Sequence, residues 1–105
     1  MKKELKIERE GAGVRVRLPS DIDHHAAKFI REEIDRHLEL LMPKRLILDF
    51  SEVTFMDSSG VGLVMGRVEC AGRYGTEVEL VGARDGILRL MRICGVERLD
   101  RLYIK

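Results

Sequence analysis

The pattern of apolar and polar residues changes period several times along the chain, and each change predicts a different element. Leu5 and Ile7 alternate with charged residues, and residues 14–18 (VRVRL) alternate again after a Gly-Ala-Gly segment. Alternation of this kind is typical of half-buried strands, and glycines between two such strands allow a tight turn. The sequence therefore predicts a β-hairpin over residues 5–18.

Three later segments repeat their apolar residues with the period of an α-helix. The first covers residues 23–42, where Asp21 or Asp23 can cap the start and Pro43 ends the helix. The second covers residues 59–74, and the third follows Gly82 and ends at Gly95, a residue typical of helix C-termini. The residues expected to face the core are Ala26, Ile30, Ile34, Leu38 and Leu41, then Val61, Val64, Met65, Val68 and Ala71, then Ile87, Leu90, Met91 and Cys94.

Short apolar runs at residues 46–50 and 77–81 predict central strands, and residues 102–104 could add a last one. The order is β-β-α-β-α-β-α, with or without a final strand. This order predicts a single α/β domain over residues 1–105, with a mixed sheet of four to five strands and three helices. The chain contains no linker, repeat or low-complexity segment that would divide it.

Composition narrows the classes of function. The 19 basic and 18 acidic residues give a net charge of +1, which offers no electrostatic basis for binding nucleic acid. The two cysteines lie far apart and in no metal-binding spacing, which suggests a reducing compartment. The start of the chain lacks the apolar stretch of a signal peptide, and no apolar run is long enough to span a membrane. We expect a cytoplasmic protein that needs no metal or cofactor and binds no membrane.

The most informative segment is residues 53–62 (VTFMDSSGVG), which leads into the second helix. It places Asp57, Ser58 and Ser59 at the helix N-terminus, where one of them is expected to cap the free backbone amides. A cap explains only one side chain of the three. A helix N-terminus also stabilises a phosphate, so a serine at this point could be phosphorylated without unfolding its own helix. The added charge of about −1.5 to −2 would then act on any protein that docks there.

Two motifs resemble those of anti-anti-sigma factors in the STAS family. Residues 55–62 (FMDSSGVG), followed by Gly66 and Arg67, resemble the phosphorylation segment of the family. Residues 21–25 (DIDHH) resemble the start of the first helix in its sporulation branch, and the expected element order agrees over residues 5–95. Family members usually continue past the last strand into another helix, whereas this chain ends at Lys105, which leaves open how the end of the sheet is covered.

The resemblance implies a binding module without catalytic residues of its own. Its partner would be an anti-sigma factor that is also an ATP-dependent serine kinase, and the acceptor would be the first serine of the Asp-Ser-Ser-Gly motif, here Ser58. The unphosphorylated form would capture the anti-sigma factor and release sigma, and a serine phosphatase would restore it after phosphorylation. Residues 21–25 favour control of the sporulation factor sigma-F, and a stress-response sigma pathway is the alternative.

Several residues are expected to meet the partner. Asp57, Ser59 and Gly60 would shape the loop around Ser58, and Asp23 would supply a charged contact. At about 100° per residue, Leu63, Cys70 and Tyr74 fall opposite the buried stripe of the second helix, with Arg67 beside them. We therefore expect an exposed docking surface with Gly62 and Gly66 next to it, where another backbone could approach closely. The expected partner-binding residues are Asp23, Asp57, Ser59, Gly60, Gly62, Leu63 and Arg67.

Three other functions fit the pattern less well. A serine hydrolase would need Gly-x-Ser-x-Gly, which is absent around Ser58, although His24 or His25 could approach Ser58 in space. The glycines at residues 60, 62 and 66 miss the dinucleotide-binding spacing by one position, and no Walker lysine follows. His24 and His25 point about 100° apart on a helix, so they do not readily bind one metal ion, and His37 is expected to be packed and hydrogen-bonded.

Overall fold

The chain begins with the expected antiparallel hairpin, formed by β1 (Lys6–Glu10) and β2 (Gly13–Arg17). The computed structural model describes residues 5–105. Gly11 adopts a φ of 62° in the turn, a backbone conformation that favours glycine. On β2, Val14 and Val16 point into the core, whereas Arg15 and Arg17 point to the opposite face. The alternation in the sequence thus sets which side of the hairpin is buried.

Three further strands complete a five-stranded sheet. β4 (Arg45–Asp49), β6 (Glu77–Val81) and β7 (Leu102–Ile104) all run parallel to β2, and the spatial order is β1-β2-β4-β6-β7. Only β1 is antiparallel, so the sheet is mixed. The predicted fold class, the order of the three helices and of the strands in this sheet, and the final strand are confirmed.

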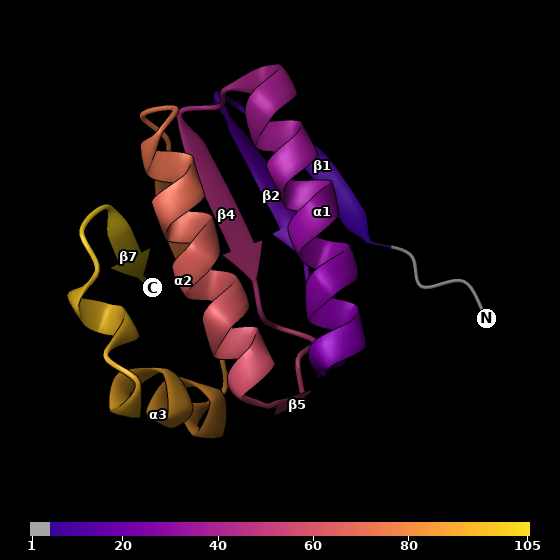
Figure 1. Cartoon of the computed structure of the whole chain (residues 1–105), viewed down its shortest axis with the longest axis vertical. Helices are drawn as coiled ribbons and strands as arrows, with labels where there is room; N and C mark the ends of the chain where they lie inside the picture. The colour runs from indigo at the N-terminus through magenta and orange to yellow at the C-terminus, as the bar shows by residue number, and fades with distance from the viewer. Residues whose placement is uncertain (1–4) are drawn as a thin grey trace.

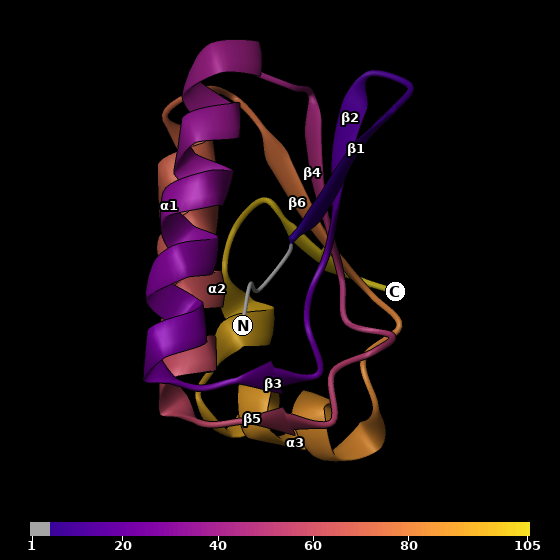
Figure 2. The same ribbon diagram turned by 90° about the vertical axis from the view of Figure 1, so that its right-hand side faces the viewer.

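Helices α1 (His24–Leu41) and α2 (Ser58–Gly72) lie side by side on one face of the sheet, as Figures 1 and 2 show. A parallel strand pair needs a long crossover, and each of these helices forms part of one. Helix α3 (Asp85–Ile93) and the short 3₁₀ helix η1 (Val96–Arg98) connect β6 to β7. Gly95 follows α3 with a φ of 78°, as expected of a residue that ends a helix.

A second, two-stranded sheet lies below the two helices (Figure 2). Its strands, β3 (Asp21–Ile22) and β5 (Phe55–Met56), pair in parallel, with Ile22 opposite Met56. The sequence analysis did not predict it, because a strand of two residues is too short to show a period. This small sheet brings the starts of α1 and α2 together.

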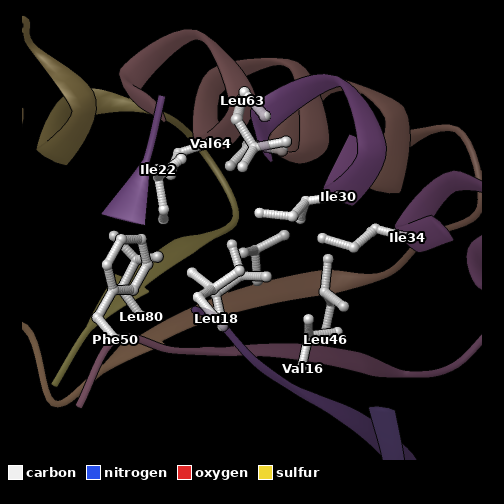
Figure 3. Packing of buried hydrophobic residues seen from close by; sticks show 14 of the residues in the cluster. Val16, Leu18, Ile22, Ile30, Ile34, Leu46, Phe50, Leu63, Val64 and Leu80 are labelled. Atoms are coloured by element: carbon white, nitrogen blue, oxygen red, sulfur yellow. The ribbon is translucent and has the colours of Figure 1, made fainter. Parts of the chain in front are cut away.

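The core lies between the large sheet and the two helices (Figure 3). Burying each large apolar side chain there contributes about 1.5–3 kcal/mol to folding. Side chains of the sheet and its flanking loops pack against those of the helices, as Figure 3 shows for Val16, Leu18, Leu46, Phe50 and Leu80 with Ile30, Ile34 and Val64.

Three residues assigned to the core are more exposed than expected. Leu41 is the last residue of α1 and is 39% exposed, and Cys94 lies beyond the end of α3. Met65 is 38% exposed, because the side of α2 that meets the sheet carries Val61, Val64 and Val68 and Met65 points away from it. Leu41 and Cys94 are exposed because they lie at helix ends, and Met65 is exposed because it lies at the edge of an apolar stripe.

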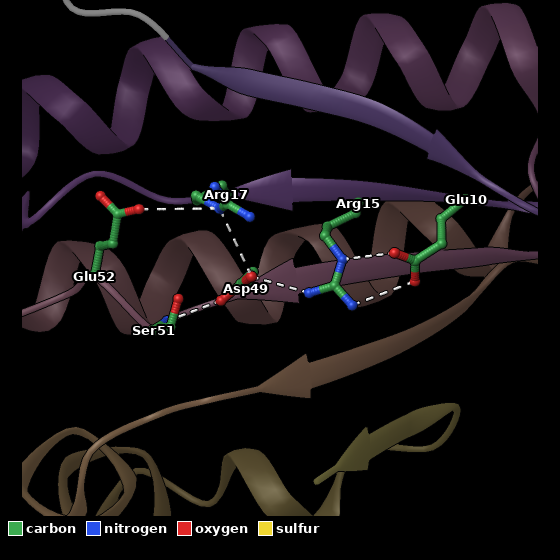
Figure 4. Close-up of polar contacts among 6 residues, drawn as sticks. All are labelled: Glu10, Arg15, Arg17, Asp49, Ser51 and Glu52. Atoms are coloured by element: carbon green, nitrogen blue, oxygen red, sulfur yellow. Dashed lines mark hydrogen bonds and ion pairs between the residues drawn. The ribbon is translucent and has the colours of Figure 1, made fainter.

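The face of the large sheet that α1 and α2 leave uncovered carries a network of charged side chains (Figure 4). Arg15 donates from Nη1 to Asp49 Oδ2 and from Nε to Glu10 Oε1, both at 2.9 Å. The backbone amide of Ser51 donates to Asp49 Oδ1, also at 2.9 Å. Asp49 is only 6% exposed, so its charge is held by these donors rather than by bulk water.

Burial alone would raise the pKa of Asp49, but the hydrogen bonds from Ser51 and Arg15 outweigh it and the pKa lies below its usual value. A carboxyl group whose pKa is lowered by folding stabilises the fold above its unfolded pKa of about 4. This stabilisation is lost as the pH falls through the lower pKa of the folded state.

The first turn of α2 packs directly on β5, and Gly60 makes this possible. A Cβ atom at Gly60 would lie 2.1 Å from Met56 Cγ and 2.5 Å from Met56 Sδ, whereas a Cβ at Gly62 would meet nothing within 4 Å. Met56 is itself buried and has little room to move. Gly60 is therefore required by the packing, and Gly62 is not.

Replacing Asp49 tests the charged network. Asp49→Asn should lower the free energy of unfolding at pH 7 by about 1–2 kcal/mol, because Arg15 loses its charged acceptor. The variant should also lose less stability than the wild type when the pH falls below about 4, since it lacks the titrating group. Urea unfolding between pH 3 and pH 7 measures both effects. Glu52→Gln is the control, since Glu52 is exposed and lies 3.9 Å from Arg17; an acid response of Asp49→Asn equal to that of the wild type would contradict this account.

Gly60 and Gly62, both near the start of α2, form a matched pair. Gly60→Ala should destabilise the protein by about 1–3 kcal/mol through overpacking against Met56. Gly62→Ala should leave stability unchanged or raise it by up to about 1 kcal/mol, because alanine favours the helix and meets no neighbour. Urea unfolding of both variants is the measurement. Equal effects at the two positions would show that the contact with Met56 is not what requires glycine.

Candidate functional site

The two helices begin next to each other, and each is capped by an aspartate. Asp23 Oδ1 accepts a hydrogen bond from the backbone amide of Ala26 at 2.9 Å, and Asp57 Oδ1 accepts one from that of Ser59 at 2.8 Å. Because β3 and β5 pair in parallel, Asp23 and Asp57 occupy equivalent places, one residue beyond Ile22 and Met56. The caps are therefore Asp23 rather than Asp21, and Asp57 rather than either serine.

Ser58 is the first residue of α2 and is exposed, whereas Ser59 is half-buried. Within residues 5–105, the Ser58 side chain makes no hydrogen bond, since Asp57 already serves as the cap. The hydroxyl of Ser58 thus lies in solvent at a helix N-terminus and can be reached by another protein.

A hollow of about 250 Å³ opens between α1 and α2, and Ser59 forms part of its wall. Three basic residues of α1, His24, Lys28 and Arg31, line one side. Their spacing of four and three residues places them on the same side of the helix. The remaining wall is formed by Ala27 of α1 and by Ser59, Gly62 and Leu63 of α2.

Leu63 and Arg67 do not form the exposed docking surface that the sequence analysis expected. Each is only 6% exposed. Arg67 donates from Nη1 to Asp35 Oδ1 on α1, so its side chain links the two helices. Helix α2 is buried on two sides, one against the sheet and one against α1, whereas the helical-wheel argument allowed for only one. Cys70 is half-buried on the side of α2 that meets Asp35 of α1, and Tyr74, just beyond the end of α2, is half-buried against the core.

Burial shifts the pKa values of two ionisable groups along the contact between α1 and α2. Burial lowers the pKa of the Arg67 guanidinium, and Asp35 opposes this shift. Arg67 Nε is buried without a hydrogen-bond partner among the described residues. Burial likewise raises the pKa of the Cys70 thiol, and Asp35 adds to this effect. These groups belong to the packing of α1 on α2 rather than to an accessible surface.

The exposed surface around Ser58 differs in part from the expected one. Asp23 and Gly62 are exposed, Asp57 is half-buried, and Gly60 is buried against Met56. The sequence analysis did not select two exposed apolar residues, Phe55 at 52% and Met65 at 38%, or the basic residues Lys28 and Arg31. The positions of Lys28 and Arg31, four and seven residues after His24, were a signal that could have identified the basic side of α1.

The histidines make no hydrogen bond to the serines at the start of α2. This holds for Ser58 and Ser59 within residues 5–105, although His24 and Ser59 both line the hollow. His37 instead places Nδ1 2.8 Å from the carbonyl oxygen of Glu33. Across residues 5–105 there is no cluster of three or more metal-binding side chains, and no helix is long and apolar enough to cross a membrane.

Known proteins resemble this chain both in sequence and in fold. The sequence profile of the STAS domain family matches residues 5–104. An anti-sigma F factor antagonist of Paenibacillus polymyxa is 25% identical over 103 residues, which cover 98% of this chain and 88% of the relative. An anti-sigma-B factor antagonist of Listeria monocytogenes is 30% identical over 101 residues, which cover 93% of this chain and 83% of the relative.

Solved structures show the same arrangement of elements. The unphosphorylated form of the anti-sigma factor antagonist SpoIIAA aligns with a TM-score of 0.76 at 25% identity, over 97% of this chain and 87% of that protein. The phosphorylated form of SpoIIAA, from Bacillus, aligns with a TM-score of 0.75 at 26% identity, over 97% and 91%. The profile match over almost the whole chain and the shared fold show that this chain belongs to the STAS domain family.

Proposed function

We propose that the chain is an anti-sigma factor antagonist whose binding to an anti-sigma factor is switched off by phosphorylation of Ser58. The observation that carries this proposal is the exposed Ser58 hydroxyl at the start of α2, next to a cap that Asp57 already supplies. A kinase can reach this hydroxyl without opening the core. The names of the relatives support the same function.

The position of Ser58 suits a switch that changes docking and leaves the fold intact. A phosphate at a helix N-terminus is stabilised by about 0.3–1 kcal/mol through the free amides and the helix dipole. Its charge of about −1.5 to −2 therefore acts mainly on the approaching partner. The relative SpoIIAA matches this chain about equally well in its unphosphorylated and phosphorylated forms, which is consistent with a fold that tolerates the phosphate.

The chemistry of the switch would belong to the partners. An anti-sigma factor with kinase activity would transfer the γ-phosphoryl group of ATP to the Ser58 oxygen, releasing ADP, and a serine phosphatase would remove it with water. The chain itself would contribute no catalytic group. Residues 21–25 favour a role in sporulation under sigma-F. The proposed location is the cytoplasm, as the spacing of the cysteines suggested. A stress-response pathway is the second candidate, because the relatives include antagonists of both an anti-sigma F and an anti-sigma-B factor.

The expected partner-binding residues divide into two groups on this structure. Asp23 and Gly62 are exposed next to Ser58 and are proposed to contact the partner directly. The others are proposed to act by shaping the surface: Asp57, Ser59 and Gly60 set the start of α2, and Leu63 and Arg67 hold it against α1.

Phosphate mapping tests the proposal. On incubation with an anti-sigma factor kinase from a sporulating relative and ATP, mass spectrometry should find one phosphate, on Ser58. Ser58→Ala should bind the unmodified partner as well as the wild type does, with stability within about 0.5 kcal/mol because Asp57 is the cap. Ser58→Asp should bind poorly. Ser59→Ala is the matched control and should still be phosphorylated on Ser58; a phosphate on Ser59 alone, or full binding by the phosphorylated chain, would refute the switch.

A further inference from the structure

The hollow between α1 and α2 is lined on one side by basic residues. His24, Lys28 and Arg31 line it from one helix, and none of the three takes part in an ion pair among the described residues. Other basic residues do find acidic partners, such as Arg36 with Glu33 and Arg15 with Glu10. One side of the hollow is therefore formed by basic side chains that make no ion pair within the described part of the chain.

Three carboxylates of this region have partners in the structure. Asp57 accepts from the amide of Ser59, and Asp23 accepts from that of Ala26. Asp35 is paired with Arg67 in the contact between the helices. Each keeps its negative charge, so the case for a basic hollow rests on Lys28 and Arg31 lining it and not on a lack of acidic neighbours.

Gly62 keeps the hollow open on the side of α2. It lines the hollow, and a Cβ atom there would meet nothing within 4 Å. Gly66 and Gly72 of the same helix also have open space around them, so the absence of a neighbour does not set Gly62 apart. Its place in the wall does, because a side chain at this position would enter the hollow and narrow it.

We propose that the hollow receives a carboxylate side chain, Asp or Glu, of the anti-sigma factor, and that Lys28 and Arg31 are its ligands with His24 at the rim. This inference rests on the proposed function and names the chemistry of its partner. The hollow of about 250 Å³ is large enough for one such side chain, and Leu63 and Ala27 provide an apolar wall for its methylene groups. Complementary charge would orient the partner as it docks.

The same arrangement explains how a phosphate on Ser58 acts. Lys28 and Arg31 together carry a charge of about +2. Ser58 itself does not line the hollow, but its neighbour Ser59 does. A phosphate on Ser58 would bring a charge of about −1.5 to −2 near these side chains and weaken their attraction for the partner's carboxylate.

Charge removal tests this proposal against a matched control. Lys28→Gln/Arg31→Gln should weaken binding to an anti-sigma factor about tenfold or more at low salt, and should flatten the dependence of affinity on salt. Arg36→Gln/Arg89→Gln removes the same net charge from α1 and α3 and should change affinity less than threefold. Gly62→Glu, which places a carboxylate of the chain itself at the hollow, should reduce binding more than Gly62→Ala does. Isothermal titration calorimetry at several salt concentrations measures these affinities.

The outcomes separate this inference from the proposed function. If the wild type binds and both double variants bind equally well, the hollow is not the contact and this proposal is overturned, while the antagonist function stands. If the wild type binds no anti-sigma factor, the proposed function falls and the hollow is tested with acetyl-tetraglutamate amide by NMR. Amide shifts at residues 28, 31, 59 and 62 that vanish in Lys28→Gln/Arg31→Gln would support a carboxylate site, and their absence would overturn it.

Discussion

The parallel pairing of β3 with β5 fixes where helices α1 and α2 begin. Backbone hydrogen bonds join the two segments. They include those from the amides of Thr54 and Phe55 to the carbonyl oxygen of Ser20, and from the amide of Asp57 to the carbonyl oxygen of Ile22. Strands of two residues have little stability of their own, and buried Ile22 and Met56 anchor them to the core. Everything proposed for the site depends on this alignment, because it places Ser58 beside the basic side of α1.

The alignment also separates the residues that hold the start of α2 from the one proposed to be phosphorylated. Asp57 satisfies the free amides of α2, and Gly60 lets the first turn of the helix pack on Met56. Because Asp57 caps the helix and Gly60 allows the close packing, the fold does not depend on the hydroxyl of Ser58. A residue that is free in this way can carry a modification whose effect falls on partner binding rather than on stability.

Much of the fold could be predicted because its elements are long enough to show a period. The hairpin, the three helices and the strands at residues 46–50 and 77–81 all follow from apolar spacing. Asp57, Ser58 and Ser59 were placed correctly at a helix start, since the change of period marks it. Leu63 and Arg67 were misplaced because the sequence does not reveal that α2 contacts α1 as well as the sheet. The hollow could not be predicted, since it is formed by side chains of two helices that only tertiary structure brings together.

The central claim is that a phosphate on Ser58 changes the surface between α1 and α2 and leaves the fold unchanged. The most direct measurement compares the ¹H–¹⁵N NMR spectra and the unfolding free energies of the chain with serine and with phosphoserine at position 58. The account predicts shifts confined to residues near the starts of α1 and α2, and an unfolding free energy changed by less than about 1 kcal/mol. Shifts spread across β4 and β6, or a loss of several kcal/mol, would contradict it.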